Sequence, residues 1–243
     1  MKLRSIKVFT DRYPWLGPLV WILSIEFFVV QLVVAAAWQS PSYSWRFHTI
    51  SDLGSTICGT IGGRPVCSPL HILMNASLIT LGLIIVVGST LIYQEFRENP
   101  YTLFGFSLMG LGGIGAMLAG IFPENTVLQL HLLGAFLPFA FGNLSLLILG
   151  AALFKVPAFL RVTTLAAGSV ALIALYFFIR QRYGGLGIGG TERLVAYPQI
   201  VWLVIFGLYM SRNHILYSHA VRRLRHTLAA AKSAARHLAS RTE

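Results

Sequence analysis

Charged residues are scarce in this sequence. Only 11% of the 243 residues are Asp, Glu, Lys or Arg, whereas a soluble domain usually carries about 25%. So few charges cannot cover a water-exposed surface, and 56% of the residues are hydrophobic. The composition therefore excludes an ordinary soluble domain and predicts a protein that lies mainly in lipid.

Acidic residues are scarcer than basic ones. Eight Asp and Glu residues stand against 19 Lys and Arg residues, which gives a net charge of +11. In a soluble protein such an excess would favour nucleic acid as a partner. Here the basic residues gather in the termini and the short connections, so we expect anionic lipid headgroups, and no nucleic acid, as the partner.

Six stretches of the sequence are each long and apolar enough to cross the hydrocarbon core of a membrane, which takes roughly 20 residues. The sequence therefore predicts an all-α polytopic membrane protein, a six-helix transmembrane bundle forming one domain. Its predicted spans are about 15–38, 70–93, 101–122, 127–154, 157–179 and 194–211. The first apolar run also resembles a signal peptide, but it is longer than an ordinary signal sequence, and we interpret it as a membrane anchor.

The basic residues predict how this bundle is oriented, because Lys and Arg accumulate on the cytoplasmic side of membrane proteins. With the N-terminus inside, fourteen of the 19 Lys and Arg residues lie on the cytoplasmic side. The five outside are Arg46, Arg64, Arg180, Arg182 and Arg193. We therefore expect a multi-pass protein of the plasma membrane with both termini in the cytoplasm.

The sequence has only two cysteines, Cys58 and Cys67, nine positions apart in the long first loop. The charge distribution places this loop outside the cytoplasm, where a disulfide is stable. The cysteines had no part in that orientation, so the two arguments support each other. We expect a Cys58–Cys67 disulfide.

Proline, glycine and basic residues mark three further features of the chain. Pro138 should kink the fourth span, and a kink can open a cavity. The glycine-rich residues 183–190 predict a flexible outer loop.

In residues 212–243, apolar positions recur at alternating steps of four and three, with basic residues around them. This pattern predicts a basic amphipathic helix on the cytoplasmic side that binds anionic lipids of the inner leaflet.

Polar residues at membrane depth are costly and need a reason. Glu26 lies in the middle of the first predicted span. It can form a hydrogen bond between helices, or it can bind a substrate or a proton. A larger group of polar residues is expected near the outer interface, from three separate parts of the chain. This group contains Tyr43, Ser51, Asp52, His71, Asn75, Glu124 and His131.

Three kinds of chemistry fit this outer cluster. His71, His131 and Asp52 can hold a zinc ion with a bound water, although the sequence contains no HExxH motif and no CxxC pair. Without a metal, Asp52, Glu124 and His131 can act as catalytic acids and bases. The third interpretation is structural or ligand-binding, with the candidate ligand-binding residues Tyr43, Ser51, His71, Asn75 and Glu26.

Parts of the cluster resemble a known family. The matching elements are Tyr43-Ser44, Ile50-Ser51-Asp52-Leu53-Gly54, Pro69, the region of Asn75, and Gly120-Ile121-Phe122-Pro123-Glu124 followed by His131. Over about residues 42–150 they resemble the bacterial and archaeal membrane family catalogued as domain of unknown function 998. The resemblance implies that Asp52, Glu124 and His131 are characteristic polar positions, but it supplies no established catalytic residue. The Ile-Ser-Asp-x-Gly element is also similar to one in the Frag1/DRAM/Sfk1 six-span families, which are associated with lipid remodelling, lipid asymmetry and autophagy.

Three functions follow as hypotheses. The first is a lipid-facing protein without catalysis, which binds, senses or helps to move lipid at the extracytoplasmic leaflet. The second is a membrane-embedded lipid hydrolase or transferase that uses Asp52, Glu124 and His131, with or without a metal. The third is a small-solute or proton-coupled transporter that uses Glu26. The sequence does not distinguish monomer from oligomer.

Overall fold

The computed structural model describes the backbone of residues 3–239 and the side chains of residues 6–213. Within this part of the chain, six helical segments are long and apolar enough to cross a membrane. They are Leu16–Ala36, His71–Tyr93, Pro100–Ile121, Leu128–Ala152, Ala158–Ile179 and Gly184–Asn213. The predicted six-span helical architecture is therefore confirmed, whereas the side of the membrane on which the termini lie stays a prediction.

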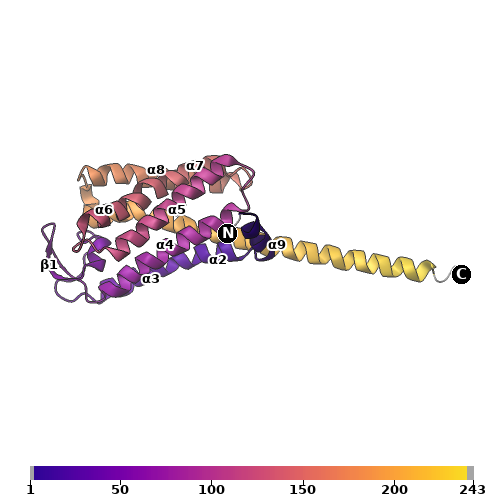
Figure 1. Ribbon diagram of the computed structural model, residues 1–243, viewed down its shortest axis with the longest axis horizontal. Coiled ribbons are helices and arrows are strands. Elements are labelled where there is room, and N and C mark those ends of the chain that lie inside the picture. Colours follow the sequence, from indigo (N-terminus) through magenta and orange to yellow (C-terminus); the bar gives the residue numbers. More distant parts are fainter. Residues whose placement is uncertain (1–2, 240–243) are drawn as a thin grey trace.

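The spans form one elongated bundle (Figure 1). A short helix, α1 (Leu3–Arg12), precedes the first span, which consists of α2 (Leu16–Ile22), a 3₁₀ turn, η1 (Leu23–Ile25), and α3 (Glu26–Ala36). The last helix, α9 (Gly187–Ala239), leaves the bundle at the same end as α1 (Figure 1). The first and last helices of the described chain thus meet the bundle at the same end.

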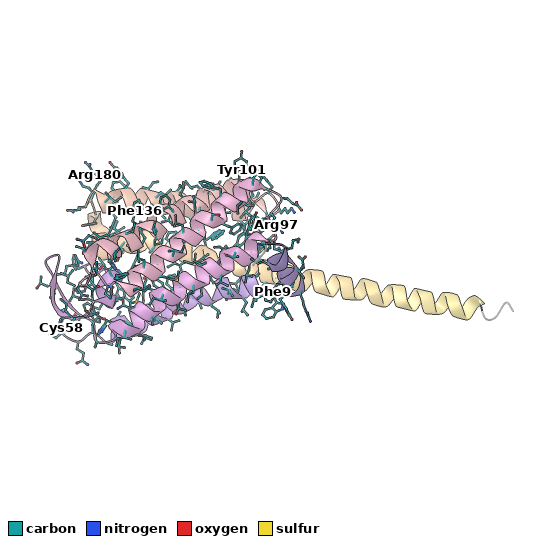
Figure 2. The ribbon with its side chains drawn as sticks, in the orientation of Figure 1. Phe9, Cys58, Arg97, Tyr101, Phe136 and Arg180 are labelled. Carbon is teal, nitrogen blue, oxygen red and sulfur yellow. A yellow bond between two sulfur atoms is a disulfide. The ribbon has the colours of Figure 1, made fainter. Side chains whose placement is uncertain are left out.

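The opposite end of the bundle carries a β-hairpin, and we call it the hairpin end. Strands β1 (Cys58–Ile61) and β2 (Arg64–Cys67) pair antiparallel, and Cys58 lies opposite Cys67. A disulfide joins these two cysteines, as predicted. Figure 2 shows Cys58 and Arg180 at the hairpin end and Phe9 and Arg97 at the other.

The second and third spans are α4 (His71–Tyr93) and α5 (Pro100–Ile121). Asn99 caps α5 by accepting a hydrogen bond from the Tyr101 N–H, and Pro100 occupies the first helical position, where it needs no hydrogen-bond acceptor. Gly82 of α4 lies so close to α5 that an added Cβ would stand 2.4 Å from the Gly113 carbonyl oxygen. Small residues therefore allow α5 to pack closely at the centre of the bundle.

The fourth span is not a regular helix. It consists of α6 (Leu128–Phe136), a π-helical segment, η3 (Leu137–Gly142), and α7 (Asn143–Ala152). The π segment contains Pro138, so the expected distortion lies where proline removes a backbone donor. The fifth span is α8 (Ala158–Ile179), which packs against α7 and α9.

The sixth span begins earlier than expected. A 3₁₀ turn, η4 (Gly184–Leu186), leads directly into α9, so most of the predicted flexible loop at 183–190 is helical. The physical reason is close packing: a Cβ on Gly189 would stand 2.1 Å from the His48 carbonyl oxygen. The Gly189 N–H also donates to the Arg46 carbonyl at 3.0 Å. Glycine here lets the first loop lie directly on the helix.

The predicted tail helix continues the sixth span without a break. The backbone of α9 is helical to Ala239 and extends beyond the bundle (Figure 1). Residues 240–243 and the side chains from His214 onward lie outside the described part of the chain. The amphipathic face expected within 212–243 therefore stays a prediction.

Candidate functional site

A short 3₁₀ turn at the hairpin end, η2 (Ser51–Gly54), carries the central residues of the site. The sequence forms this turn through reciprocal hydrogen bonds. Asp52 Oδ2 accepts from the Thr49 N–H at 2.7 Å, and Thr49 Oγ1 accepts from the Asp52 N–H at 3.0 Å. Asn75 of α4 donates to the Gly54 carbonyl at 2.9 Å. The turn is therefore attached to the bundle, with Asp52 fully buried and Ser51 half-buried.

Asp52 forms a two-pronged ion pair with Arg64 of β2. Arg64 Nε donates to Oδ2 and Nη2 donates to Oδ1, both at 3.0 Å. Burial alone would raise the pKa of Asp52, but the hydrogen bonds from Arg64, Glu124 and the Thr49 N–H outweigh it and hold that pKa below its ordinary value. Asp52 is therefore ionised at neutral pH, and the hairpin that carries Arg64 is held onto the turn.

Glu124, in the connection between α5 and α6, completes this group. Burial raises its pKa to about 9, and the neighbouring charge of Asp52 and a hydrogen bond to that carboxylate act in the same direction. Glu124 thus stays protonated at neutral pH, and its carboxyl O–H donates a hydrogen bond to ionised Asp52. We call Asp52, Arg64 and Glu124 the ion-pair cluster, which carries one negative and one positive charge.

Ser51, directly before Asp52, belongs to a second group. Ser51 Oγ lies 2.8 Å from His131 Nε2 of α6 and 3.4 Å from Glu192 Oε1 of α9. The other carboxyl oxygen of Glu192 accepts a short hydrogen bond from the Ile50 N–H. Both His131 and Glu192 are buried. We call Ser51, His131 and Glu192 the serine–histidine cluster; it joins three parts of the chain that are far apart in the sequence.

The environment of His131 determines which ring nitrogen carries the proton in the neutral imidazole. Nδ1 lies 2.9 Å from the Phe122 carbonyl oxygen and 3.3 Å from that of Ala119. A carbonyl oxygen can only accept, so Nδ1 is the protonated nitrogen. Nε2 is then an acceptor, and the single O–H of Ser51 donates a hydrogen bond to it at 2.8 Å rather than to Glu192 Oε1 at 3.4 Å. The arrangement is a hydroxyl, a base and a group that orients the base.

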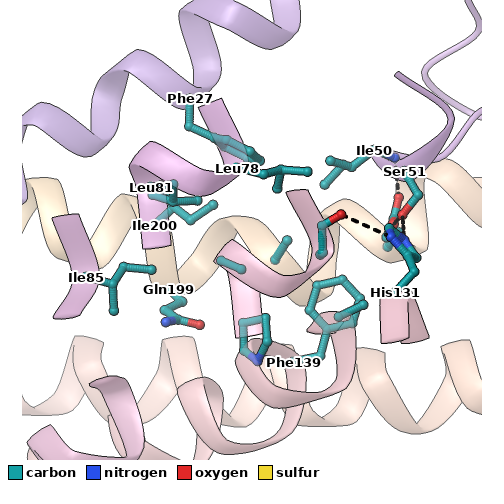
Figure 3. A pocket seen from close by; sticks show the side chains of 16 residues that line it. Phe27, Ile50, Ser51, Leu78, Leu81, Ile85, His131, Phe139, Gln199 and Ile200 are labelled. Atoms are coloured by element: carbon teal, nitrogen blue, oxygen red, sulfur yellow. Dashed lines mark hydrogen bonds between the residues drawn. The ribbon is translucent and has the colours of Figure 1, made fainter. Parts of the chain in front are cut away.

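The serine–histidine cluster lies at one end of an internal cavity of about 60 Å³, which we call the chamber. Figure 3 shows Ser51 and His131 at one end and Ile85 and Gln199 at the other. The wall is mainly apolar and includes Phe27, Leu78, Leu81, Ala135, Phe139, Ala196 and Ile200. Pro138 and Phe139 of the π segment form part of it, so the irregular fourth span does line a cavity.

Tyr43, a predicted ligand-binding residue, lies instead in the packing of the first loop. Arg193 donates to the Tyr43 hydroxyl and to the carbonyls of Trp45, His48 and Gly189, the last three at 3.1, 2.9 and 2.8 Å. Arg193 thereby holds the first loop onto the start of α9, next to Glu192. Burial raises the pKa of Tyr43, so its hydroxyl stays protonated.

The other predicted residues are brought together only in part. Asp52 and Glu124 form the ion-pair cluster, whereas His131 belongs to the serine–histidine cluster. His71 lies at the start of α4, where Nδ1 faces the Ser68 carbonyl at 3.0 Å. Glu26 accepts a hydrogen bond from Ser77 of α4 at 2.8 Å, which links the first two spans.

The structure does not bring the predicted zinc ligands together. Across the described side chains, no group of three or more His, Cys, Asp or Glu residues could hold a metal ion. The nitrogens of His131 face a serine and backbone carbonyls, and Asp52 faces Arg64, Glu124 and the Thr49 N–H. The expected set of His71, His131 and Asp52 therefore forms no metal site in this structure.

Two side chains of the candidate site are not predicted by the sequence. The sixth apolar stretch of the sequence begins only at about residue 194, which puts Glu192 in a loop, whereas the structure has it inside α9. Its position just inside a span is the signal that could have identified it, since acidic residues at membrane depth are costly. In the sequence, Arg64 does not differ from the four other basic residues predicted outside the cytoplasm. Its spacing from Asp52 does not indicate a two-pronged ion pair.

Comparisons with known proteins are consistent with this description. No curated protein and no solved structure is significantly similar to the chain. A family model described as "Protein of unknown function (DUF998)" matches residues 22–209, a region that contains all six spans apart from a few terminal residues, and both clusters. The chain therefore belongs to this family of proteins of unknown function.

Proposed function

We propose that the protein binds a lipid-derived acyl chain in the chamber, with the polar end of that chain at the serine–histidine cluster. The observation that carries this proposal is the distribution of polarity along the chamber wall. Hydroxyl, imidazole and carboxyl groups gather at one end, and most of the remaining wall is aliphatic or aromatic. An amphiphile with one apolar chain has the same polarity pattern.

The size of the chamber restricts the ligand. A volume of about 60 Å³ is several times the roughly 10–15 Å³ that one buried water molecule needs, but it is too small for a whole phospholipid. The proposal therefore concerns a single chain, with the carbons nearest the polar group inside the chamber. At the opposite end, Gln199 Nε2 already donates to Met109 Sδ at 3.0 Å, so this amide is less available to a ligand.

The charge distribution supports a location for this binding. If the termini are cytoplasmic, the hairpin end faces the extracytoplasmic side of the plasma membrane, and the ligand comes from the outer leaflet. The basic residues of 212–243 would then contact anionic lipids of the inner leaflet. Transport through Glu26 is less well supported, because Glu26 does not line the chamber.

A photo-crosslinkable fatty acid tests the proposal. The purified protein is irradiated with a diazirine-bearing fatty acid, and the modified peptides are identified by mass spectrometry. We expect modification of chamber residues, and we expect Ala196→Phe, which fills the chamber, to reduce it at least tenfold. Ala166→Phe on the exposed face of α8 is the matched control and should have no effect. Equal modification of both variants would show that the fatty acid binds elsewhere.

A further inference from the structure

We propose that Ser51 is a nucleophile and His131 its general base in an acyl-transfer reaction at the polar end of the chamber. This inference rests on the proposed function, because the chamber supplies the site for the acyl chain. The substrate class is an ester of a single-chain fatty acid. Water or an alcohol is the second reactant.

The geometry of the pair is that of an activated serine. The distance of 2.8 Å between Ser51 Oγ and His131 Nε2 lies within the range for nucleophile and base. The Phe122 carbonyl accepts from Nδ1 and thereby fixes the tautomer in which Nε2 can take the serine proton. The base is therefore ready to act in the ground state.

Other serines of the bundle differ from Ser51. Ser24, Ser68 and Ser145 are buried and donate to backbone carbonyls at 2.6 Å, which satisfies the hydroxyl locally. Among the described side chains, Ser51 is the serine whose hydroxyl group bonds to a histidine ring, and it also lines a cavity. A hydroxyl that only stabilised the fold would not need both features.

The surroundings hold Ser51 in place from both sides. The following residue, Asp52, is fixed by Arg64 and by Thr49, as described above. The preceding residue, Ile50, donates its N–H to Glu192, which is buried against the same turn. Glu192 is therefore a positioning residue. A nucleophile on a fixed turn loses little conformational entropy when it attacks.

The reaction proceeds in two balanced steps. Ser51 Oγ attacks the ester carbonyl carbon while its proton passes to His131 Nε2. The carbon–oxygen bond to the alcohol then breaks, and the alcohol leaves with that proton, so Ser51 carries the acyl group as an ester. Water or a second alcohol attacks this ester and gives a proton to Nε2. The bond to Ser51 Oγ breaks, and the serine takes the proton back.

An alkyl fluorophosphonate tests this inference, because it modifies a serine only when the hydroxyl is activated. The purified full-length protein is treated with a fluorescent alkyl fluorophosphonate, and the modified peptide is mapped. We expect modification at Ser51, its loss in Ser51→Ala, and a rate about 10²–10⁴-fold lower in His131→Gln, which keeps a hydrogen-bonding side chain. Ser24→Ala, which loses a short buried hydrogen bond within the first span, is the matched control and should be modified like the wild type.

The outcomes separate this inference from the proposed function. If Ser51→Ala still crosslinks the diazirine fatty acid but the folded wild type shows no fluorophosphonate modification, acyl transfer is refuted and acyl-chain binding stands. If neither reagent reacts in the chamber, both proposals fail. Ser51 modification that is unchanged in Ala196→Phe would show that the acyl chain does not lie in the chamber. Glu192→Gln should keep the modification, at a reduced rate, because an amide oxygen still accepts from the Ile50 N–H.

Discussion

Replacing Asp52 with Asn should destabilise the hairpin end of the bundle by about 3 kcal/mol. The change removes the carboxylate that accepts both hydrogen bonds from Arg64, whose side chain is only 18% exposed. Breaking a buried ion pair by removing one partner typically costs about 3–5 kcal/mol, because the other charge stays desolvated. Arg64 keeps some access to water, so the lower end of this range applies. For a chain of this size, the change corresponds to a fall in Tm of roughly 6–12 °C.

Thermal unfolding in detergent, followed by the fluorescence of buried tryptophans, measures this effect. Arg64→Gln should cost a similar amount, and the double variant should cost less than the sum of the two, since it leaves neither charge unpaired. Lys155 and Glu98 form the control ion pair: their atoms are 2.7 Å apart, but their side chains are 58% and 81% exposed. Glu98→Gln should leave Tm unchanged. If Asp52→Asn shifted Tm no more than Glu98→Gln, the role assigned to the ion-pair cluster would be wrong.

Three further predictions follow from the structure. Folding raises the pKa of Glu124 from its ordinary value of 4.5 to about 9, so between these two pH values the folded chain binds more protons than the unfolded chain. Tm should therefore fall as the pH rises from about 6 to 9, and Glu124→Gln should make Tm less dependent on pH. Replacing Cys58 and Cys67 with Ser should lower the free energy of unfolding by about 2–3 kcal/mol, the value expected for a disulfide that joins residues nine positions apart. A reducing agent should cause the same loss in the wild type and none in this variant. A membrane-impermeant maleimide should label Thr60→Cys but not Lys155→Cys in intact cells, and the reverse pattern would overturn the predicted orientation.

Much of the fold could be predicted from the sequence, because lipid imposes strong constraints. A span must be long and apolar, so the six helices can be read from hydropathy alone. Pro138 correctly marked the irregular fourth span and its link to a cavity. The disulfide could be predicted because Cys58 and Cys67 lie in one loop that the charge distribution assigns to the side outside the cytoplasm, where disulfides are stable. The start of the sixth span was missed, because glycines that allow helix packing look the same in the sequence as glycines of a flexible loop.

The candidate site could be predicted only in part. Membrane depth marks Asp52, Glu124 and His131 as polar residues that need partners, and the structure has each of them bonded at the hairpin end. These three residues fall into two clusters according to which side of the short turn Ser51–Gly54 each of them contacts. A 3₁₀ turn of four residues is too short for hydrophobic periodicity to predict which way its side chains point. Ser51 and Asp52 are adjacent in the sequence, yet they bond to different partners. Arg64 was missed because its pairing with Asp52, 12 positions away, depends on how the hairpin folds. Glu192 was missed because its partners Ile50 and Ser51 lie 142 and 141 positions away in the first loop.

An experimental density map of the protein in lipid nanodiscs would test the central claim most directly. The proposed acyl-chain binding predicts elongated density in the chamber, with one end within hydrogen-bonding distance of Ser51 Oγ and His131 Nε2. The apolar part of the density should run toward Phe27, Leu81 and Ile200. A chamber that contains only ordered water, or is collapsed, in a map that resolves lipids around the bundle would contradict the claim.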